Sequence, residues 1–540
     1  MNILKGIGNF LIRQKYKKFN ENLFSKLKPS KKTVLIEFNA FAESHVCQSL
    51  LANFLAKKFK LNIISYFNYC ILAAPLKPTF LQKIRWNFGK FINFKNHGVY
   101  KSIGSKDTIR PAIINKNLQK EKRISKLIYK KLKNKNDILK IHMSGVLMGD
   151  LIYDTFLKSN KVATIDIKDR RFFALLKDFV HLFYYWNNYF KENDVHSIIG
   201  VHSVYSYGLP LRIAISKGIK AYTINSREIS KITNKHYFPG TNFLDYPKKF
   251  SLLKKNIQIN ALRESKKILL KRVSGSGGEN NHLISKNSSF HSKKQKTIIK
   301  KSNKIKILIC TRNLFDAAHV FGNLLFTDNF EWLKFLGDLS DKTDYEWYLK
   351  THINFEGKFK LYQPHSNKVI NNILKKYKKI VILPNDYSHK QIIDEKINYV
   401  LTQHGSVGFE YPFLGIPVIN ASYNNPQIAY RFNLHPKNKL KYQNLLTNLK
   451  NNKKKIKIDK DKITEFYYMR HIYQDRKWLF DNPTNMIKSI GGWDNMMNEQ
   501  FYKYSMTKLN NQKINTLNIS FNKFLNSDYQ SISIEDTSKI

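Results

Sequence analysis

The segment whose residue types most clearly suggest chemistry is 398–420, with the sequence NYVLTQHGSVGFEYPFLGIPVIN. Its apolar start predicts a buried strand that ends at Thr402, and Gly405 permits a tight turn close to a ligand. Ser406 is expected to cap the helix that follows, and Gly415 to terminate it. The exposed amides at such a helix start, beyond the carboxyl end of a parallel strand, form a site for a phosphate group. A turn with a purely structural role would show the same pattern.

Side chains that could bind the rest of a phosphorylated ligand lie in the same segment and after another strand. Glu410, about one turn into the predicted helix, could accept hydrogen bonds from a ribose. His404 could donate a hydrogen bond to a diphosphate or sugar oxygen. Lys350 and His352 follow a predicted strand, where basic side chains would stabilise a departing phosphate. A surface lysine and a structural histidine are the alternative interpretations.

Other candidates also follow predicted strands. Asp316 and His319 lie in a loop after a strand, and a helix-capping role is the alternative for Asp316. A transfer that inverts configuration needs a general base for the acceptor hydroxyl. The candidates are Glu43 and His45 in the loop after the first strand, and His202 after a later one. Each of the three could instead be a cap or a satisfied loop residue.

The elements that must position these residues alternate between strands and helices. Helices are predicted over 45–57 and 209–217, with Pro210 in the first turn of the second. Strands are predicted over 33–38, 62–66, 197–201, 220–224, 304–310, 346–349, 379–383, 398–402 and 418–421. This alternation is typical of parallel sheets wrapped by helices, so the expected fold class is α/β, with two doubly wound Rossmann-like domains and a cleft between them.

A shift in composition over 273–303, rich in Gly, Ser, Asn and Lys, indicates a linker or mobile loop between the two domains. The expected order is a basic amphipathic helix over 1–28, an acceptor domain over 29–272, the linker, a donor domain over 304–450, a helical segment over 451–490 and a polar, loosely held tail over 491–540.

The composition excludes several classes of protein. The 540-residue chain has 93 Lys and Arg against 39 Asp and Glu, a formal net charge of +54 that would attract polyanions. A genome-wide compositional bias would produce the same excess, and no compact RNA-reading motif stands out, so no specific nucleic-acid partner is expected. Three scattered cysteines argue against a disulfide framework or a thiolate metal site. With no long apolar run and no signal peptide, a cytoplasmic protein is expected.

The N-terminal residues carry Ile3, Leu4, Ile7, Phe10 and Leu11 at helical spacing. The basic residues Arg13, Lys15, Lys17 and Lys18 follow them. A helix of this kind could lie on an anionic membrane surface, which would place the protein at the inner face of the membrane. A helix packed on the protein's own surface is the alternative.

Residues 404–420 resemble the donor-site segment of GT-B glycosyltransferases, especially those of capsule and surface-polysaccharide biosynthesis. The family typically shows a strand, a turn with a Gly-Ser or Gly-Thr pair, a helix with Glu, and then Gly-x-Pro-Val. The matching positions are His404, Gly405, Ser406, Glu410, Gly415 and Pro417.

Other segments are similar to the same family, and together they cover most of 33–445. They are residues 145–158, 310–319 with 326–333, 347–352 and 425–436, although Ile353 stands where the family usually has proline. These motifs are fairly specific for the family and poorly specific for the sugar.

The resemblance implies a metal-independent transferase that uses a nucleotide-sugar as substrate, with no cofactor, and a bacterial glycan or glycolipid as acceptor. Asp150 and Asp154 share a helical face, and paired carboxylates could suggest a metal site. The Asp-x-Asp pattern that would bind a metal with a nucleotide occurs at Asp459-Lys460-Asp461, but it lies in a lysine-rich connector. No His/Cys cluster appears either, so no metal is expected. The alternatives are a sugar-nucleotide epimerase, a polyol-phosphate transferase of the same fold, and a non-catalytic basic protein that binds RNA or a membrane.

Overall fold

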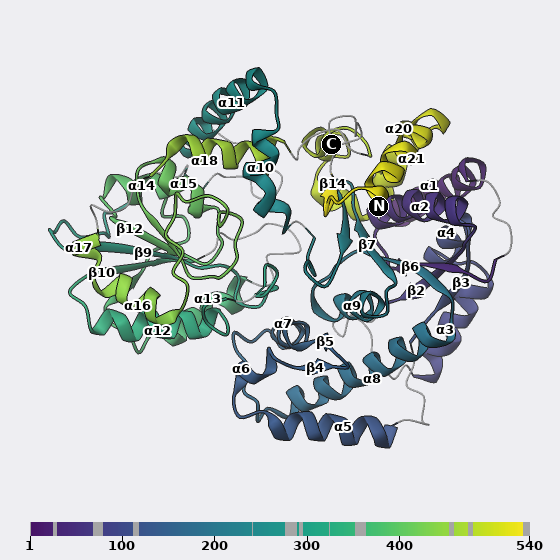
Figure 1. The fold of residues 1–540 in the computed structure, drawn as a ribbon, viewed down its shortest axis with the longest axis horizontal. Coiled ribbons are helices and arrows are strands. Elements are labelled where there is room, and N and C mark those ends of the chain that lie inside the picture. The colour runs from purple at the N-terminus through teal and green to yellow at the C-terminus, as the bar shows by residue number, and fades with distance from the viewer. Residues whose placement is uncertain are drawn as a thin grey trace. The chain divides into compact units, whose positions relative to one another are not determined.

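The computed structural model describes residues 2–24, 30–68, 79–111, 118–239, 241–275, 289–290, 295–322, 324–351, 363–452, 458–473 and 479–532. It divides into two compact units. Unit 1 comprises residues 1–155, 167–240 and 474–540, and unit 2 comprises 156–166 and 241–473. Each unit is an α/β structure built on its own sheet (Figure 1). The expected fold class, two doubly wound Rossmann-like domains, is therefore confirmed for each unit.

Unit 1 contains a seven-stranded sheet in the order β14-β8-β7-β6-β1-β2-β3. Its strands are β1 (Thr33–Phe38), β2 (Asn62–Phe67), β3 (Ser105–Ile109), β6 (Val195–Gly200), β7 (Lys220–Ile224), β8 (Ile229–Ile232) and β14 (Ser531–Ile532). The five from β3 to β7 are parallel, whereas β8 and β14 are antiparallel to their neighbours. β1, which is the first strand along the chain and lies in the middle of the sheet, is buried along its whole length. The chain thus starts at the centre and winds outward in both directions, as in a doubly wound fold.

The helices of unit 1 are α1 (Asn2–Leu23), α2 (Ala42–Phe59), α3 (Phe80–Phe91), α4 (Asn96–Ser102), α5 (Leu118–Lys131), α6 (Lys135–Ile138), α8 (Arg170–Glu192), α9 (Gly208–Ser216), α19 (Pro483–Ser489), α20 (Glu499–Lys508) and α21 (Asn511–Asn526). A short hairpin of β4 (His142–Met143) and β5 (Val146–Leu147) precedes α7 (Gly149–Asn160), which runs from unit 1 into unit 2.

Unit 2 contains a five-stranded, fully parallel sheet in the order β11-β10-β9-β12-β13. Its strands are β9 (Lys306–Cys310), β10 (Glu346–Lys350), β11 (Ile380–Ile382), β12 (Tyr399–Thr402) and β13 (Val418–Asn420). Its helices are α10 (Tyr246–Ser251), α11 (Lys255–Val273), α12 (Asn329–Asp341), α13 (Gln363–Leu374), α14 (His389–Asp394), α15 (Val407–Phe413), α16 (Lys439–Thr447), α17 (Leu449–Asn452) and α18 (Lys460–Tyr467).

Alternate residues of β9 point to opposite faces of the unit 2 sheet. Ile307 and Ile309 pack in a core with residues of α12, α13 and α16. Leu308 packs in a second core with residues of α14 and α15. Because strand side chains alternate with a period of two, both faces of this sheet are covered by helices.

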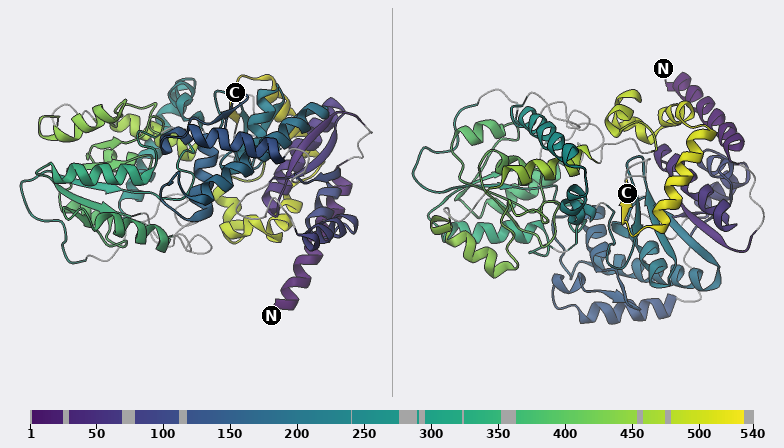
Figure 2. Two further views of the ribbon diagram at one scale, coloured as in Figure 1. Left: turned by 90° about the horizontal axis from the view of Figure 1, so that it is seen from below. Right: turned by 45° about the horizontal axis from the view of Figure 1, so that its top comes forward.

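The strands predicted from the sequence all exist, with ends that differ by at most two residues. The C-terminal region differs more from expectation. Residues 499–526, within the expected polar tail, form α20 and α21, which lie against α1 and α2 in unit 1 (Figure 2). Their asparagines are part of the reason: Asn498 and Asn510 accept backbone hydrogen bonds as N-caps. Tyr502 stacks on Tyr16 of α1 at 4.2 Å between ring centroids.

The division of the chain also differs from the expected one at the linker. Unit 2 includes α10 and α11, which were expected in the first domain. The reason is packing, because Leu269 and Val273 of α11 are buried in one core with Phe466 of α18. Within the expected linker, Phe290 is buried in the same core, and the Ser289 carbonyl accepts a hydrogen bond from the His389 amide at 2.9 Å.

Candidate functional site

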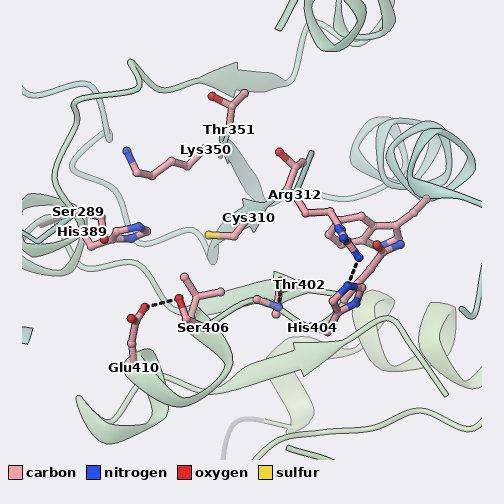
Figure 3. A pocket seen from close by; sticks show the side chains of 15 residues that line it. Ser289, Cys310, Arg312, Lys350, Thr351, His389, Thr402, His404, Ser406 and Glu410 are labelled. Atoms are coloured by element: carbon pink, nitrogen blue, oxygen red, sulfur yellow. Dashed lines mark hydrogen bonds between the residues drawn. The ribbon is translucent and has the colours of Figure 1, made fainter. Parts of the chain in front are cut away.

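A pocket of about 270 Å³ lies at the carboxyl ends of three parallel strands of unit 2 (Figure 3). Cys310, Lys350 and Thr402 are the last residues of β9, β10 and β12, and all three line it. The other lining residues are Ser289, Thr311, Arg312, Trp332, Thr351, His389, Gln403, His404, Gly405, Ser406, Val407 and Glu410.

The strand order explains why a pocket forms here. From β9 the chain goes to β10 and β11 on one side, and then returns to β12 and β13 on the other. The connections that leave β9 and β12 therefore diverge to opposite faces of the sheet and leave a crevice between them. Ligands of open α/β sheets bind at this reversal of strand order.

The predicted turn between β12 and α15 forms one wall of the pocket. The Gly405 amide donates a hydrogen bond to Thr402 Oγ1 at 3.2 Å, and a Cβ on Gly405 would lie only 3.0 Å from that oxygen. A side chain here would require Thr402 to shift, so glycine favours the close approach of the backbone. Gly415 ends the helical segment with φ of +86°, as expected.

Ser406 does not cap α15, contrary to expectation. It has helical backbone angles, and its side chain makes no cap hydrogen bond. An N-cap residue has an extended backbone, and its side chain accepts a hydrogen bond from an amide of the first helical turn. Ser406 meets neither condition, so it is not an N-cap by this definition. The Ser406 hydroxyl lies instead 3.3 Å from Glu410 Oε2, to which it donates.

Glu410 lines the pocket and also forms a buried ion pair. Its side chain is 2% exposed, and Arg272 of α11 donates to Oε1 from Nε at 2.7 Å. Arg272 lies over the ring of Phe409 at 5.4 Å, which keeps the guanidinium in place. One carboxylate oxygen is thus engaged by the arginine, and the other lies beside the Ser406 hydroxyl.

His404 and Arg312 are hydrogen-bonded at the other side of the pocket (Figure 3). Burial and the positive charge of Arg312 hold the pKa of His404 well below its usual value. The ring is therefore neutral, and because Nε2 accepts from Arg312 Nη1, the ring proton belongs on Nδ1. That buried nitrogen has no hydrogen-bond partner among the described residues.

Lys350 is the most buried cation of the pocket, with 4% of its surface exposed. Its ammonium donates to the carbonyls of Asn385 at 2.9 Å and Tyr387 at 2.6 Å. Burial lowers the pKa of Lys350 from 10.5 to about 8, while Cys310 and Asp386 act in the opposite direction. The group is thus mostly protonated at neutral pH, and close to the pH at which it loses its charge.

Two polar side chains in the pocket wall have unused hydrogen-bonding groups. Gln403 is 2% exposed, and neither its Oε1 nor its Nε2 has a partner within the described parts of the chain. The same holds for the hydroxyl of Thr311. Since buried polar groups are rarely left unpaired, such atoms at a pocket mark a place where a ligand or water would complete them.

Two other predicted donor-site residues, Asp316 and His319, do not line this pocket. His319 is buried, and its Nε2 is 3.0 Å from the carbonyl of Thr327, so it holds the loop before α12. Asp316 pairs with Lys158 at 2.8 Å and does not cap a helix, since Asp328 caps α12. His352 lies outside the described residues.

The three candidate bases lie near the carboxyl ends of β1 and β6 in unit 1. Since α2 begins at Ala42, Glu43 and His45 are in its first turn and not in a loop. Glu43 is half-buried and accepts a hydrogen bond from the Ser226 amide at 2.9 Å. His202 follows β6 and is exposed.

His45 is fully enclosed in unit 1. Its Nδ1 is hydrogen-bonded to the hydroxyl of Tyr502, and its Nε2 lies 3.0 Å from the carbonyl of Asn39. Burial lowers the pKa of His45 to about 4, so the ring is neutral. A ring bonded on both sides and out of contact with solvent is suited to holding α2 in place.

Asp150 also has a structural partner in unit 1. Both of its carboxylate oxygens accept from the guanidinium of Arg212, each at 2.6 Å. Such a bidentate pair occupies the carboxylate that a metal would need. In the part of the chain that the structure describes, no group of three or more His, Cys, Asp or Glu side chains could hold a metal ion.

Sequence reasoning missed several pocket residues. Arg312 could have been found, because it comes two residues after the end of β9. Gln403 was inside the recognised turn but has no charge to draw attention. His389 and Arg272 come from α14 and α11, and only the tertiary fold brings them to the pocket or to Glu410.

No protein-family model matches the chain, and no curated protein sequence matches it. Solved structures do match. One is KpsC of Thermosulfurimonas dismutans, a β-Kdo 2,4-transferase, with 12% identity and a TM-score of 0.30 over 51% of this chain and 79% of that one. Another is the UDP-GlcNAc 2-epimerase of Neisseria meningitidis bound to UDP-GlcNAc, with 8% identity and a TM-score of 0.22 over 82% and 99%.

A third match is the wall teichoic acid polymerase TagF, in a structure soaked with CDPG, with 12% identity and a TM-score of 0.21 over 97% of this chain and 98% of that one. Likenesses at these values do not distinguish a transferase from an epimerase. The fold assignment rests on the strand order and on the parallel pairing within each unit.

Proposed function

We propose that the protein is a glycosyltransferase that moves a sugar from a nucleotide-sugar donor to a surface-polysaccharide acceptor, with the donor bound in the unit 2 pocket. The observation that supports the donor site most strongly is the position of the pocket at the reversal of strand order, with Arg312 and Lys350 in its wall. Two cations beside unused polar groups suit a phosphorylated ligand.

In this proposal the diphosphate lies between Arg312 and Lys350. Sugar transfer releases the diphosphate as the leaving group, and fixed positive charges stabilise the negative charge that develops on it. Arg312 offers a planar fork suited to phosphate oxygens, whereas Lys350 supplies a partly desolvated point charge. The neutral His404 would add its Nδ1–H as a further donor.

The nucleoside end of the donor is assigned to the side of the pocket that contains Glu410 and Ser406. A ribose hydroxyl would donate to Glu410 Oε2, which lies beside the Ser406 hydroxyl. The rest of the nucleotide-sugar would form hydrogen bonds with the unpaired amide of Gln403 and with the hydroxyl of Thr311. All of these groups are present before a ligand arrives, so little reorganisation is needed.

For the acceptor hydroxyl we propose His202 as the general base, because it is exposed while His45 is enclosed and Glu43 is engaged by Ser226. Histidine titrates near neutral pH and is suited to accept that proton. No metal or cofactor takes part in this proposal.

Thermal denaturation with a panel of nucleotides tests the donor site. A nucleotide at about 100 times its dissociation constant should stabilise the protein by roughly 2.7 kcal/mol. We expect at least one of CMP, CDP, UDP and GDP to raise the melting temperature, and the R312Q variant to lose the effect. If none raises it in the wild type, the pocket is not a nucleotide site.

Product analysis then separates the enzyme classes. With donor and glycan acceptor, a transferase releases a nucleoside diphosphate in proportion to sugar transferred. An epimerase would instead produce an isomeric nucleotide-sugar with no acceptor present, and a polyol-phosphate transferase would release a nucleoside monophosphate. Salt-sensitive RNA binding without any nucleotide effect would favour a non-catalytic protein.

A further inference from the structure

One helix of unit 1 presents an apolar, aromatic face to solvent. Along α3 the large apolar side chains recur at spacings of one, three, four and three residues, which places them on one side of a helix. They are 47–84% exposed: Phe80, Leu81, Ile84, Phe88 and Phe91. Ile92 and Phe94 continue the surface at 45% and 52% exposure. We call these seven side chains the α3 face.

The orientation of this face is set by the packing of α3 on its other side. Gly89 is the buried residue of the helix, and Trp86 packs edge-on against Phe38 and Phe67 at 5.3 and 5.5 Å. A Thr79 capping box closes the first turn. Because the opposite side of α3 is anchored to the core, the apolar face cannot turn inward without breaking those contacts.

The exposed charges on and next to α3 are mainly basic, with Asp107 paired to Lys90 of the helix. Lys83, Arg85 and Lys95 are exposed on or next to α3, and the sequence contains no acidic residue between Glu43 and Asp107. An apolar aromatic face bordered mainly by cations complements a bilayer whose headgroups are anionic, since phenylalanine enters the acyl boundary while lysine and arginine stay at the phosphates.

A second helix shows the same combination. In α1 the side chains of Ile7, Phe10 and Leu11 are 51–53% exposed at helical spacing. The later part of α1 is anchored by Tyr16, which is 1% exposed. Both α1 and α3 contact α4, so the two amphipathic helices belong to one region of unit 1 (Figure 1).

We propose that the α3 face inserts into the headgroup region of an anionic lipid bilayer, with α1 as a second contact, and so holds the protein on a membrane surface. In the described part of the chain every helix is too short or too polar to cross a bilayer. The attachment that we propose is interfacial. Its residues belong to unit 1 and the donor pocket belongs to unit 2, so this inference does not depend on the donor proposal.

Vesicle co-sedimentation of the full-length protein tests this inference. The probes are vesicles of phosphatidylcholine alone and of phosphatidylcholine mixed with phosphatidylglycerol. We expect binding to the anionic vesicles that weakens as salt is raised, because exposed charges are screened. The F88E/F91E variant should bind at least about tenfold more weakly, because it removes two inserted rings and adds like charge. F88L/F91L should retain most of the binding.

The control is L440E, which adds one negative charge, against two in F88E/F91E, at a residue of α16 in unit 2 that is 66% exposed. It should bind vesicles as the wild type does. All variants should keep the wild-type melting temperature and its response to nucleotide, since the changed side chains face solvent. Failure of vesicle binding with an intact nucleotide response would therefore separate the two proposals.

Three results would overturn the inference. The first is an absence of binding to anionic vesicles, and the second is equal binding by the wild type and F88E/F91E. The third is a wild type that is a dimer in light scattering and binds no vesicles, while F88E/F91E is a monomer. The last would assign the face to a second copy of the chain.

Discussion

The carboxyl edges of the two sheets have the same strand order but different contents. In each unit the first strand is central, the next two lie on one side, and the fourth and fifth lie on the other. In unit 2 this edge is a pocket walled by Arg312 and Lys350. In unit 1, Glu37 at the end of β1 is 2% exposed, and the nearby His45 is fully enclosed.

This difference shows that the fold provides a place for a site and the side chains decide whether one exists there. At the unit 1 edge the Val201 amide donates to Glu37 Oε2 at 3.0 Å, so the carboxylate links β1 to the turn after β6. At the unit 2 edge, Arg312 and Lys350 line a pocket together with the buried side chain of Gln403. The comparison predicts that changes at Glu37 and His45 alter stability, and that changes in the unit 2 pocket alter ligand binding unless they touch a buried pair.

The largest expected effect comes from Glu410, which belongs to both the pocket and a buried pair. E410A removes the carboxylate that pairs with the Arg272 guanidinium, and removing one member of a buried pair costs about 3–5 kcal/mol. We expect this loss in denaturant unfolding. The double variant R272M/E410L should recover much of it, and a single E410A that unfolds like the wild type would contradict the importance of the pair.

Arg312 should show the opposite behaviour, with a large effect on binding and a small one on stability. R312Q removes a charged donor from the phosphate position, so nucleotide affinity should fall by about tenfold to 100-fold, measured by calorimetry. R171Q is the control, because Arg171 is an exposed arginine of unit 1 paired with Asp169. Equal affinities of the wild type and R312Q would exclude the assigned phosphate position.

Lys350 predicts a pH dependence of binding. Because its pKa is lowered to about 8, the charged form is lost as pH rises above that value, and with it the attraction for a diphosphate. Nucleotide affinity should therefore fall, approaching about tenfold per pH unit above pH 8. K350M should bind weakly at every pH and lack this slope. A wild-type affinity that stays constant from pH 7 to about 9.5 would show that the lysine does not contact the anion.

Glu37 predicts a smaller effect, on stability at the unit 1 edge. Burial raises its pKa from 4.5 to about 7, so the native state binds more protons than the unfolded state between these values. The stabilisation by protonated Glu37 is present below pH 4.5 and is lost as pH rises through 7. E37Q, which stays neutral, should gain stability relative to the wild type across this window in unfolding experiments. A constant difference would show that Glu37 does not titrate there.

The smallest expected effect is that of metal removal. The proposed transfer uses only side-chain cations, so treatment with EDTA should leave the rate of sugar transfer unchanged. Loss of activity that Mg²⁺ or Mn²⁺ restores would show that a metal takes part.

The sequence by itself determined the α/β class, the strands and the turn at residues 402–405. These are local properties, since strand periodicity, glycine positions and apolar runs are written in consecutive residues. The limits of β1 and β7 agree fully with the prediction. The polar tail was misjudged because asparagines that look like loop residues serve as N-caps for α20 and α21.

Only the tertiary structure decided which side chains meet. Glu410 was expected to accept hydrogen bonds from a ribose, but its pairing with Arg272 joins residues 138 positions apart in the chain, which the sequence does not show. His45 was a candidate base from the sequence, but in the structure it is buried and hydrogen-bonded to Tyr502, which is 457 residues away in the chain. The exposed side of α3 follows from the same kind of contact, because the packing of Gly89 and Trp86 decides which face is left outside. Long-range packing sets burial, and burial sets the charge state and the accessibility on which chemistry depends.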